Sequence, residues 1–68
     1  MRVILSRIRE ARNLTQQAVA DAANISQGHY NYIESGKSRP SPRVAERIAQ
    51  VLSIKKEDIF AVFYGEGA

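Results

Sequence analysis

Residues 15–37 read TQQAVADAANISQGHYNYIESGK, and this stretch carries the clearest structural signals of the chain. Thr15 and Ser26 are residue types that accept a backbone N–H bond at a helix start, so each predicts a helix that begins at the next residue. Asn24 tolerates the left-handed backbone conformation that a tight turn between the two helices needs. The stretch therefore predicts a helix over 16–23, a turn at 24–26 and a helix over 27–35 that Gly36 ends.

Apolar residues recurring every three or four positions predict further helices. One such face precedes Asn13, a residue that can end a helix, and comprises Met1, Ile4, Leu5 and Ile8. A loop over 37–42, rich in proline and serine, leads to Ser41-Pro42, which is a favourable helix start. The helix that follows buries Ala45, Ile48, Ala49 and Leu52. With a short fifth helix over 56–60, the sequence predicts an all-α domain of five helices.

The length of 68 residues fits a single domain over 1–68. Within this domain, residues 61–64 form an apolar segment rich in strand formers. The chain has no cysteine, so it can form neither a disulfide nor a thiolate zinc site. It has one histidine, and we expect no metal or other cofactor. No glycine-rich phosphate loop is present, so we do not expect an enzyme. No apolar run approaches the ~20 residues of a membrane span and no signal-peptide pattern appears, so we expect a cytoplasmic protein.

The pair of helices in 16–35 has the features of a helix-turn-helix. Ala20 lies where the two helices should approach most closely, and a larger side chain there would push them apart. The angle between the helices can be filled by Val19, Ala23, Ile25, Tyr30 and Ile33. The second helix is then free to enter a major groove about 12 Å wide.

A longer set of residues resembles the phage-repressor and Cro-like (XRE-type) helix-turn-helix family of transcription regulators. The resemblance covers about residues 5–60 and lies in Arg9, Leu14-Thr15-Gln16, Val19-Ala20, Ile25-Ser26, Ile33-Glu34, Gly36-Lys37, Pro40-Ser41, Ile48-Ala49 and Leu52. Two positions depart from the family pattern: Asn24 replaces the usual turn glycine, and Tyr30 replaces a smaller aliphatic residue. The resemblance implies a lambda-repressor-like DNA-binding fold and, for Arg9 and Glu34, a partly buried salt bridge between the first and third helices.

The outer stripe of the helix over 27–35 predicts base readout. At 100° per residue this stripe comprises Gln27, Gly28, Asn31 and Tyr32. Glutamine and asparagine can bond bidentately to adenine, and Gln27 stands at the helix start, which reaches deepest into the groove. The resemblance assigns specificity to the positions of Gln27, Gly28 and Tyr32. Tyr32 could instead stack on a sugar, donate to a phosphate or pack against a neighbouring loop.

Further residues predict contacts with the phosphates. Gln16 begins a helix, where free N–H groups favour an anion, and the resemblance gives it the same role. His29 lies on the flank of its helix, where it could contact a phosphate or pack beside the preceding helix. The remaining phosphate candidates are the cations that follow the recognition helix: Lys37, Arg39 and Arg43. They belong to a chain with ten Lys and Arg against seven Asp and Glu.

The C-terminal tail, 61–68, and the residues before it predict a homodimer. The candidate contacts are Phe60, Val62, Phe63 and Tyr64, which could pair through helix packing or a short antiparallel strand, or could all pack within one chain. A two-fold dimer suits a palindromic operator with half-sites ~34 Å apart. The function that follows is a sequence-specific regulator, most simply a repressor. The alternative is a protein-interaction module such as an antitoxin or adaptor, and single-stranded RNA binding is less favoured because stacking aromatics are few.

Overall fold

Polar caps divide the chain into its helices. In the computed structural model, which describes residues 2–65, Thr15, Ser26 and Ser41 each precede a helix and accept a backbone N–H from three residues further on, at 3.0, 3.0 and 3.3 Å. The helices are α1 (Val3–Ala11), α2 (Gln16–Ala23), α3 (Gln27–Ser35) and α4 (Pro42–Leu52), and two short turns follow, η1 (Lys56–Asp58) and η2 (Ala61–Gly65). The predicted all-helical fold is confirmed.

Left-handed residues end the helices where the sequence predicts them. Asn13, Asn24 and Gly36 have φ angles of 59°, 63° and 87°. Ser53 also adopts φ 56° after α4, although its residue type gives no signal for that conformation. These tight ends let four short helices fold back on one another.

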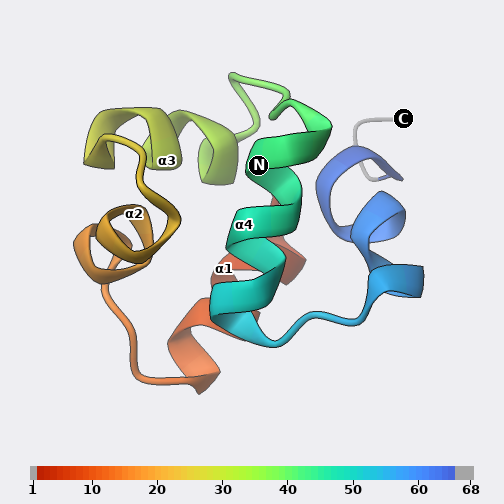
Figure 1. Cartoon of the computed structure of the whole chain (residues 1–68), viewed down its shortest axis with the longest axis horizontal. Coiled ribbons are helices and arrows are strands. Elements are labelled where there is room, and N and C mark those ends of the chain that lie inside the picture. The colour runs from red at the N-terminus through yellow and green to blue at the C-terminus, as the bar shows by residue number, and fades with distance from the viewer. Residues whose placement is uncertain (1, 66–68) are drawn as a thin grey trace.

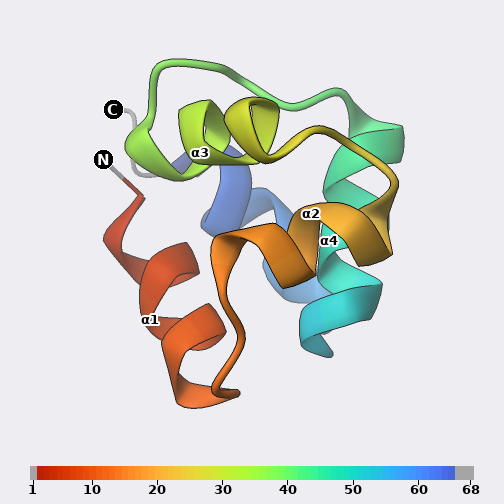
Figure 2. The same ribbon diagram turned by 90° about the vertical axis from the view of Figure 1, so that its left-hand side faces the viewer.

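In Figure 1, α4 lies between α2 and α3 on one side and the C-terminal turns on the other. Figure 2 shows α3 lying across α2, with α1 beside them. The core is formed by twelve buried residues from every α-helix and from η2: Leu5, Val19, Ala20, Ala23, Tyr30, Ile33, Ala45, Ile48, Ala49, Leu52, Val62 and Phe63. Ala20 has no exposed surface, as its place between the paired helices predicts.

The inner face of the first helix differs from its apolar pattern at one described position. Leu5 is fully buried and Ile8 packs against the core. Ile4 is 48% exposed, so the predicted inner face is wrong at this position. Met1 lies outside the described residues.

The C-terminal segment is helical throughout its described part. The fifth helix starts at Lys56 as a 3₁₀ turn, and Ala61–Gly65 form a π-helical turn, so the sequence's helical alternative holds for this segment and the strand does not. Val62 is 5% exposed and Phe63 is fully buried. Both side chains therefore pack in the core of their own chain, which is the alternative that the sequence left open for them. Phe60 remains 71% exposed, and residues 66–68 of the predicted tail lie outside the described residues.

A charged pair joins the first and third helices. Arg9 Nε donates to Glu34 Oε2 at 2.8 Å, and a terminal nitrogen of Arg9 donates to Glu34 Oε1 at 3.1 Å. The side chains of the pair are 13% and 5% exposed. The other terminal nitrogen of Arg9 donates to the Leu14 carbonyl at 2.8 Å, so one guanidinium also fixes the connection that follows α1.

No helix within residues 2–65 is long and apolar enough to cross a membrane.

Replacing Arg9 should remove most of the stability of the domain. Loss of one partner from a buried ion pair costs about 3–5 kcal/mol because the other charge stays buried. A core of this size rarely supplies more than about 3–5 kcal/mol, so Arg9→Ala should be largely unfolded in thermal melts followed by circular dichroism. Glu10→Gln is the control, because Glu10 is 68% exposed and lies 3.9 Å from Arg9. An Arg9→Ala variant with the wild-type melting temperature would contradict this role.

Candidate nucleic-acid interface

Helix α3 has a sharp division between an inner and an outer face. Tyr30 and Ile33 have no exposed surface. The exposed residues of α3 are polar, aromatic or without a side chain, and comprise Gln27, Gly28, His29, Asn31 and Tyr32. The structure thus brings all four predicted base readers to the exposed side of one short helix.

Gln16 connects this face to the start of α2. Its side-chain nitrogen donates to Glu34 Oε1 at 3.0 Å. Its side-chain oxygen accepts from Asn31 Nδ2 at 3.2 Å and lies 3.4 Å from Gln27 Nε2, which also donates to it. The two amide side chains that could read bases are therefore oriented by a third amide. The sequence predicted a phosphate contact for Gln16 but gave no sign of this network.

Gly28 is not required by the packing of its own chain. A Cβ at this position would meet no described atom within 4 Å. Glycine in a helix is less favourable than alanine by about 0.8–1 kcal/mol. The fold therefore gives no reason for glycine here, whereas an approaching molecule would.

Apart from Gln16 on α2, the predicted phosphate contacts lie on α3, on the loop that follows it and on the start of α4. Figure 2 shows this loop doubling back from the end of α3 to α4. Lys37 Nζ lies 5.7 Å from the centre of the Tyr32 ring, and the Arg39 guanidinium lies 5.8 Å from that of Tyr64. Such cation–π contacts hold each cation in place and leave its charge intact. Arg43 is exposed on the first turn of α4.

The electrostatics of α3 are set by its one carboxylate, Glu34. Burial alone would raise the pKa of Glu34, but the hydrogen bonds from Arg9 and Gln16 outweigh it and hold this pKa below the usual value of 4.5. The same contact with Glu34 raises the pKa of Arg9. Burial raises the pKa of Tyr30 well above its ordinary range, and the nearby carboxylate adds to this shift. Since this carboxylate is buried and neutralised, the exposed face of α3 carries no negative side chain.

Arg2 is a buried residue that the sequence analysis missed. It is 9% exposed, and its guanidinium donates to the carbonyls of Ile33, Ser38 and Phe63. Its own backbone N–H donates to the Glu34 carbonyl at 2.8 Å. No spacing rule singles out an arginine beside the chain start, because its partners lie far along the sequence.

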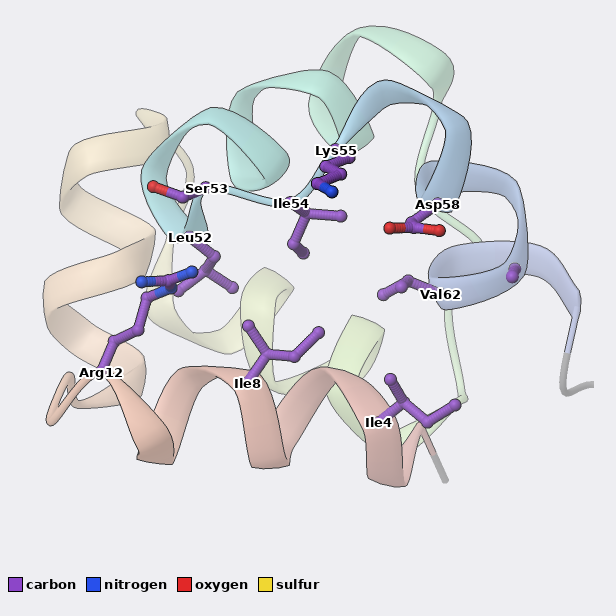
Figure 3. A pocket seen from close by; sticks show the side chains of 10 residues that line it. Ile4, Ile8, Arg12, Leu52, Ser53, Ile54, Lys55, Asp58 and Val62 are labelled. Carbon is purple, nitrogen blue, oxygen red and sulfur yellow. The ribbon is translucent and has the colours of Figure 1, made fainter.

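An apolar groove of about 410 Å³ lies between α1 and the C-terminal turns. Figure 3 shows Ile8 pointing into it, with Ile4 and Val62 at one end and Arg12 at the other. Neither α2 nor α3 contributes to its lining. The sequence did not predict the groove, because its walls come from opposite ends of the chain. Within residues 2–65 no three His, Cys, Asp or Glu side chains gather to hold a metal ion.

Comparisons with known proteins agree with this geometry. A family model described as helix-turn-helix matches residues 5–59. An uncharacterised HTH-type transcriptional regulator of Archaeoglobus fulgidus is 35% identical over 60 residues, covering 88% of this chain and 84% of the relative. Similar regulators of Methanocaldococcus jannaschii and Bacillus subtilis are 40% and 38% identical over 52 residues, covering 76% of this chain and 79% and 68% of those relatives. No solved structure matches the chain.

The lowered pKa of Glu34 predicts how stability depends on pH. A carboxylate whose pKa is lower in the folded chain than in the unfolded chain stabilises the fold above the unfolded value, and this contribution is lost as the pH falls through the folded pKa. We expect the free energy of unfolding to decline once the pH falls below the ordinary value of 4.5.

Glu34→Gln should be less stable than wild type at neutral pH and should lose less stability on acidification. Urea unfolding from neutral pH down to strong acid measures both profiles. Parallel profiles for the two proteins would show that Glu34 does not carry the acid sensitivity.

Proposed function

The chain belongs to the helix-turn-helix family, and from this premise we propose that it is a sequence-specific regulator that reads the major groove of duplex DNA with α3. The observation that carries the proposal is the outer face of this helix, which is polar, exposed and free of negative charge. An α-helix fits the major groove, where each base pair presents a distinct set of donors and acceptors.

Base readout belongs to the start and middle of the helix. Gln27 and Asn31 present amides that can bond bidentately to adenine. Gly28 allows the backbone to approach a base edge or a thymine methyl group closely, which explains why the position is glycine although the fold has room for a methyl group. Tyr32 is 55% exposed, which suits a contact with a sugar or a phosphate.

Phosphate contacts set the register on the duplex. Gln16 lies at the start of α2, where unbonded backbone N–H groups and the helix dipole favour an anion. The cations that add to this anchoring are Lys37, Arg39 and Arg43, with His29 on the flank of α3. A chain held in this way over a promoter blocks polymerase, so repression is the simplest regulatory outcome.

We also propose that two copies bind a palindromic operator. Phe60 is the predicted contact that the fold leaves most accessible, at 71% exposure, and it supports pairing at the C-terminal end of the chain. A two-fold dimer would place the two recognition helices about one helical turn of DNA apart, at ~34 Å.

The alternative function is a protein-interaction module. The apolar groove between α1 and the C-terminal turns favours it, because an apolar wall suits a protein surface. The uncharged polar amides of α3 favour DNA. A folded chain that binds no duplex at low salt would favour the alternative.

Dimerisation predicts a specific result in solution. Sedimentation equilibrium at high micromolar concentration should give twice the chain mass, and Phe60→Ser should lower the association constant. Val3→Ser is the matched control, because Val3 is also an exposed apolar residue, at 41%, on a different element. The mass of a single chain at the highest concentration would contradict the dimer.

Replacing Gln27 and Lys37 should separate base readout from anchoring. Gln27→Ala should cost about 1–3 kcal/mol at one base position and relax the preference there, whereas Lys37→Ala should weaken all sequences alike and flatten the dependence on salt. Random-pool selection of bound duplexes followed by titration at two salt concentrations measures both effects.

Gln50→Ala is the control for these variants, because Gln50 is an exposed glutamine near the end of α4. Identical effects of Gln27→Ala and Lys37→Ala across all sequences would contradict the division of roles.

A further inference from the structure

We propose that Tyr64 and Arg2 position the basic loop, residues 37–41, for contact with DNA phosphates. The inference rests on the proposed DNA-binding function and extends it to two side chains outside the helix-turn-helix. Neither side chain needs to touch DNA, since Arg2 is buried and Tyr64 is half-buried.

The basic loop leaves the end of α3 with few restraints from its own backbone. The N–H groups of Lys37 and Ser38 both donate to the Tyr32 carbonyl, at 2.9 and 3.1 Å. Beyond them, the carbonyls of Ser38 and Pro40 accept hydrogen bonds from side chains that lie at the two ends of the chain. The course of the loop is therefore fixed from outside the helix-turn-helix.

Tyr64 supplies the first of these fixed points. Its hydroxyl donates to the Pro40 carbonyl at 2.8 Å. Its ring lies 5.8 Å from the Arg39 guanidinium and 5.8 Å from the ring of Phe60. The neighbouring Phe63 is fully buried, so the core holds the turn that carries Tyr64. Tyr64 thus restrains both the backbone of the loop and one of its two cations.

Arg2 supplies the second fixed point. Its Nε donates to the Phe63 carbonyl at 2.9 Å, and one terminal nitrogen donates to the carbonyls of Ile33 and Ser38. One planar guanidinium thus joins η2, the last turn of α3 and the basic loop, a fork that a lysine could not reproduce. A cation at this end of α3 also complements the helix dipole.

The two restraints strengthen binding because the loop has less conformational freedom left to lose when it binds DNA. A loop that is already in place loses less conformational freedom when its cations meet phosphates, and this raises affinity without adding a contact to the duplex. The benefit falls on phosphate contacts, so it is shared by all sequences.

The test is Tyr64→Phe, which keeps the ring and removes the hydroxyl. Loss of one hydrogen bond should raise the dissociation constant for every duplex roughly threefold to tenfold, with the base preference unchanged. Titrations use the full chain at a temperature at which circular dichroism shows each variant to be folded. Arg2→Lys should act in the same direction, because it keeps the charge and loses the fork.

A variant whose basic loop carries no cations distinguishes positioning of the loop from general destabilisation of the fold. In a Lys37→Gln, Arg39→Gln background, Tyr64→Phe should no longer change the dissociation constant, because no loop cation remains to be positioned. Val62→Ala is the matched control in the same turn: it should lower the melting temperature and leave the dissociation constant of the folded chain unchanged.

Two results would overturn the inference alone: wild-type affinity in Tyr64→Phe, or an equal loss in the native and neutralised backgrounds. A wild-type chain that binds no duplex would overturn the proposed function and this inference with it.

Discussion

The buried carboxylate of Glu34 holds three of the helices together. A buried charge needs hydrogen-bonding or oppositely charged partners, and removing any partner leaves the charge buried without compensation. Arg9 reaches it from α1 with two hydrogen bonds, and Gln16 reaches it from the start of α2 with a third. Three helices are therefore fixed around one side chain of α3, and the rotation of α3 about its own axis is fixed with them.

This fixed rotation determines what the helix presents to the outside. Tyr30 and Ile33 complete the inner side, so the side chains of Gln27, Asn31 and Tyr32 can only lie outward. Gln16 contributes twice, because the same amide that satisfies Glu34 also orients Asn31 and Gln27. The core and the outer face of α3 thus share one hydrogen-bond network, so the orientation of the proposed base readers depends on the stability of the fold.

The ends of the chain complete the arrangement from the other side. Arg2 and Tyr64 hold the backbone of the loop after α3, and the turn Ala61–Gly65 places Phe63 in the core. A helix-turn-helix of only twenty residues has little core of its own. It is held in place by α4 and by residues from the two ends of the described chain, Arg2 and Phe63.

The sequence predicted the features that depend on neighbouring residues. Helix starts at Thr15, Ser26 and Ser41 follow from side-chain caps, and the outer stripe of α3 follows from helical periodicity. Features that depend on distant pairs were not predictable: the contacts of Arg2, the role of Gln16 between two helices, and the groove.

The apolar segment near the C-terminal end also shows what the sequence alone could not predict. Its composition indicates that Val62 and Phe63 leave water, and only the folded arrangement shows that the core of their own chain buries them. The pairing of Arg9 with Glu34 came from family resemblance, since no local pattern links two residues so far apart.

An NMR titration of the folded chain with a duplex selected from a random pool shows which face of the chain meets DNA. The amide signals of Gln27, Asn31 and Tyr32 should shift on binding, while those of Ile8 and Ile54 in the groove should stay in place. Shifts confined to the groove, with α3 unaffected, would contradict this prediction.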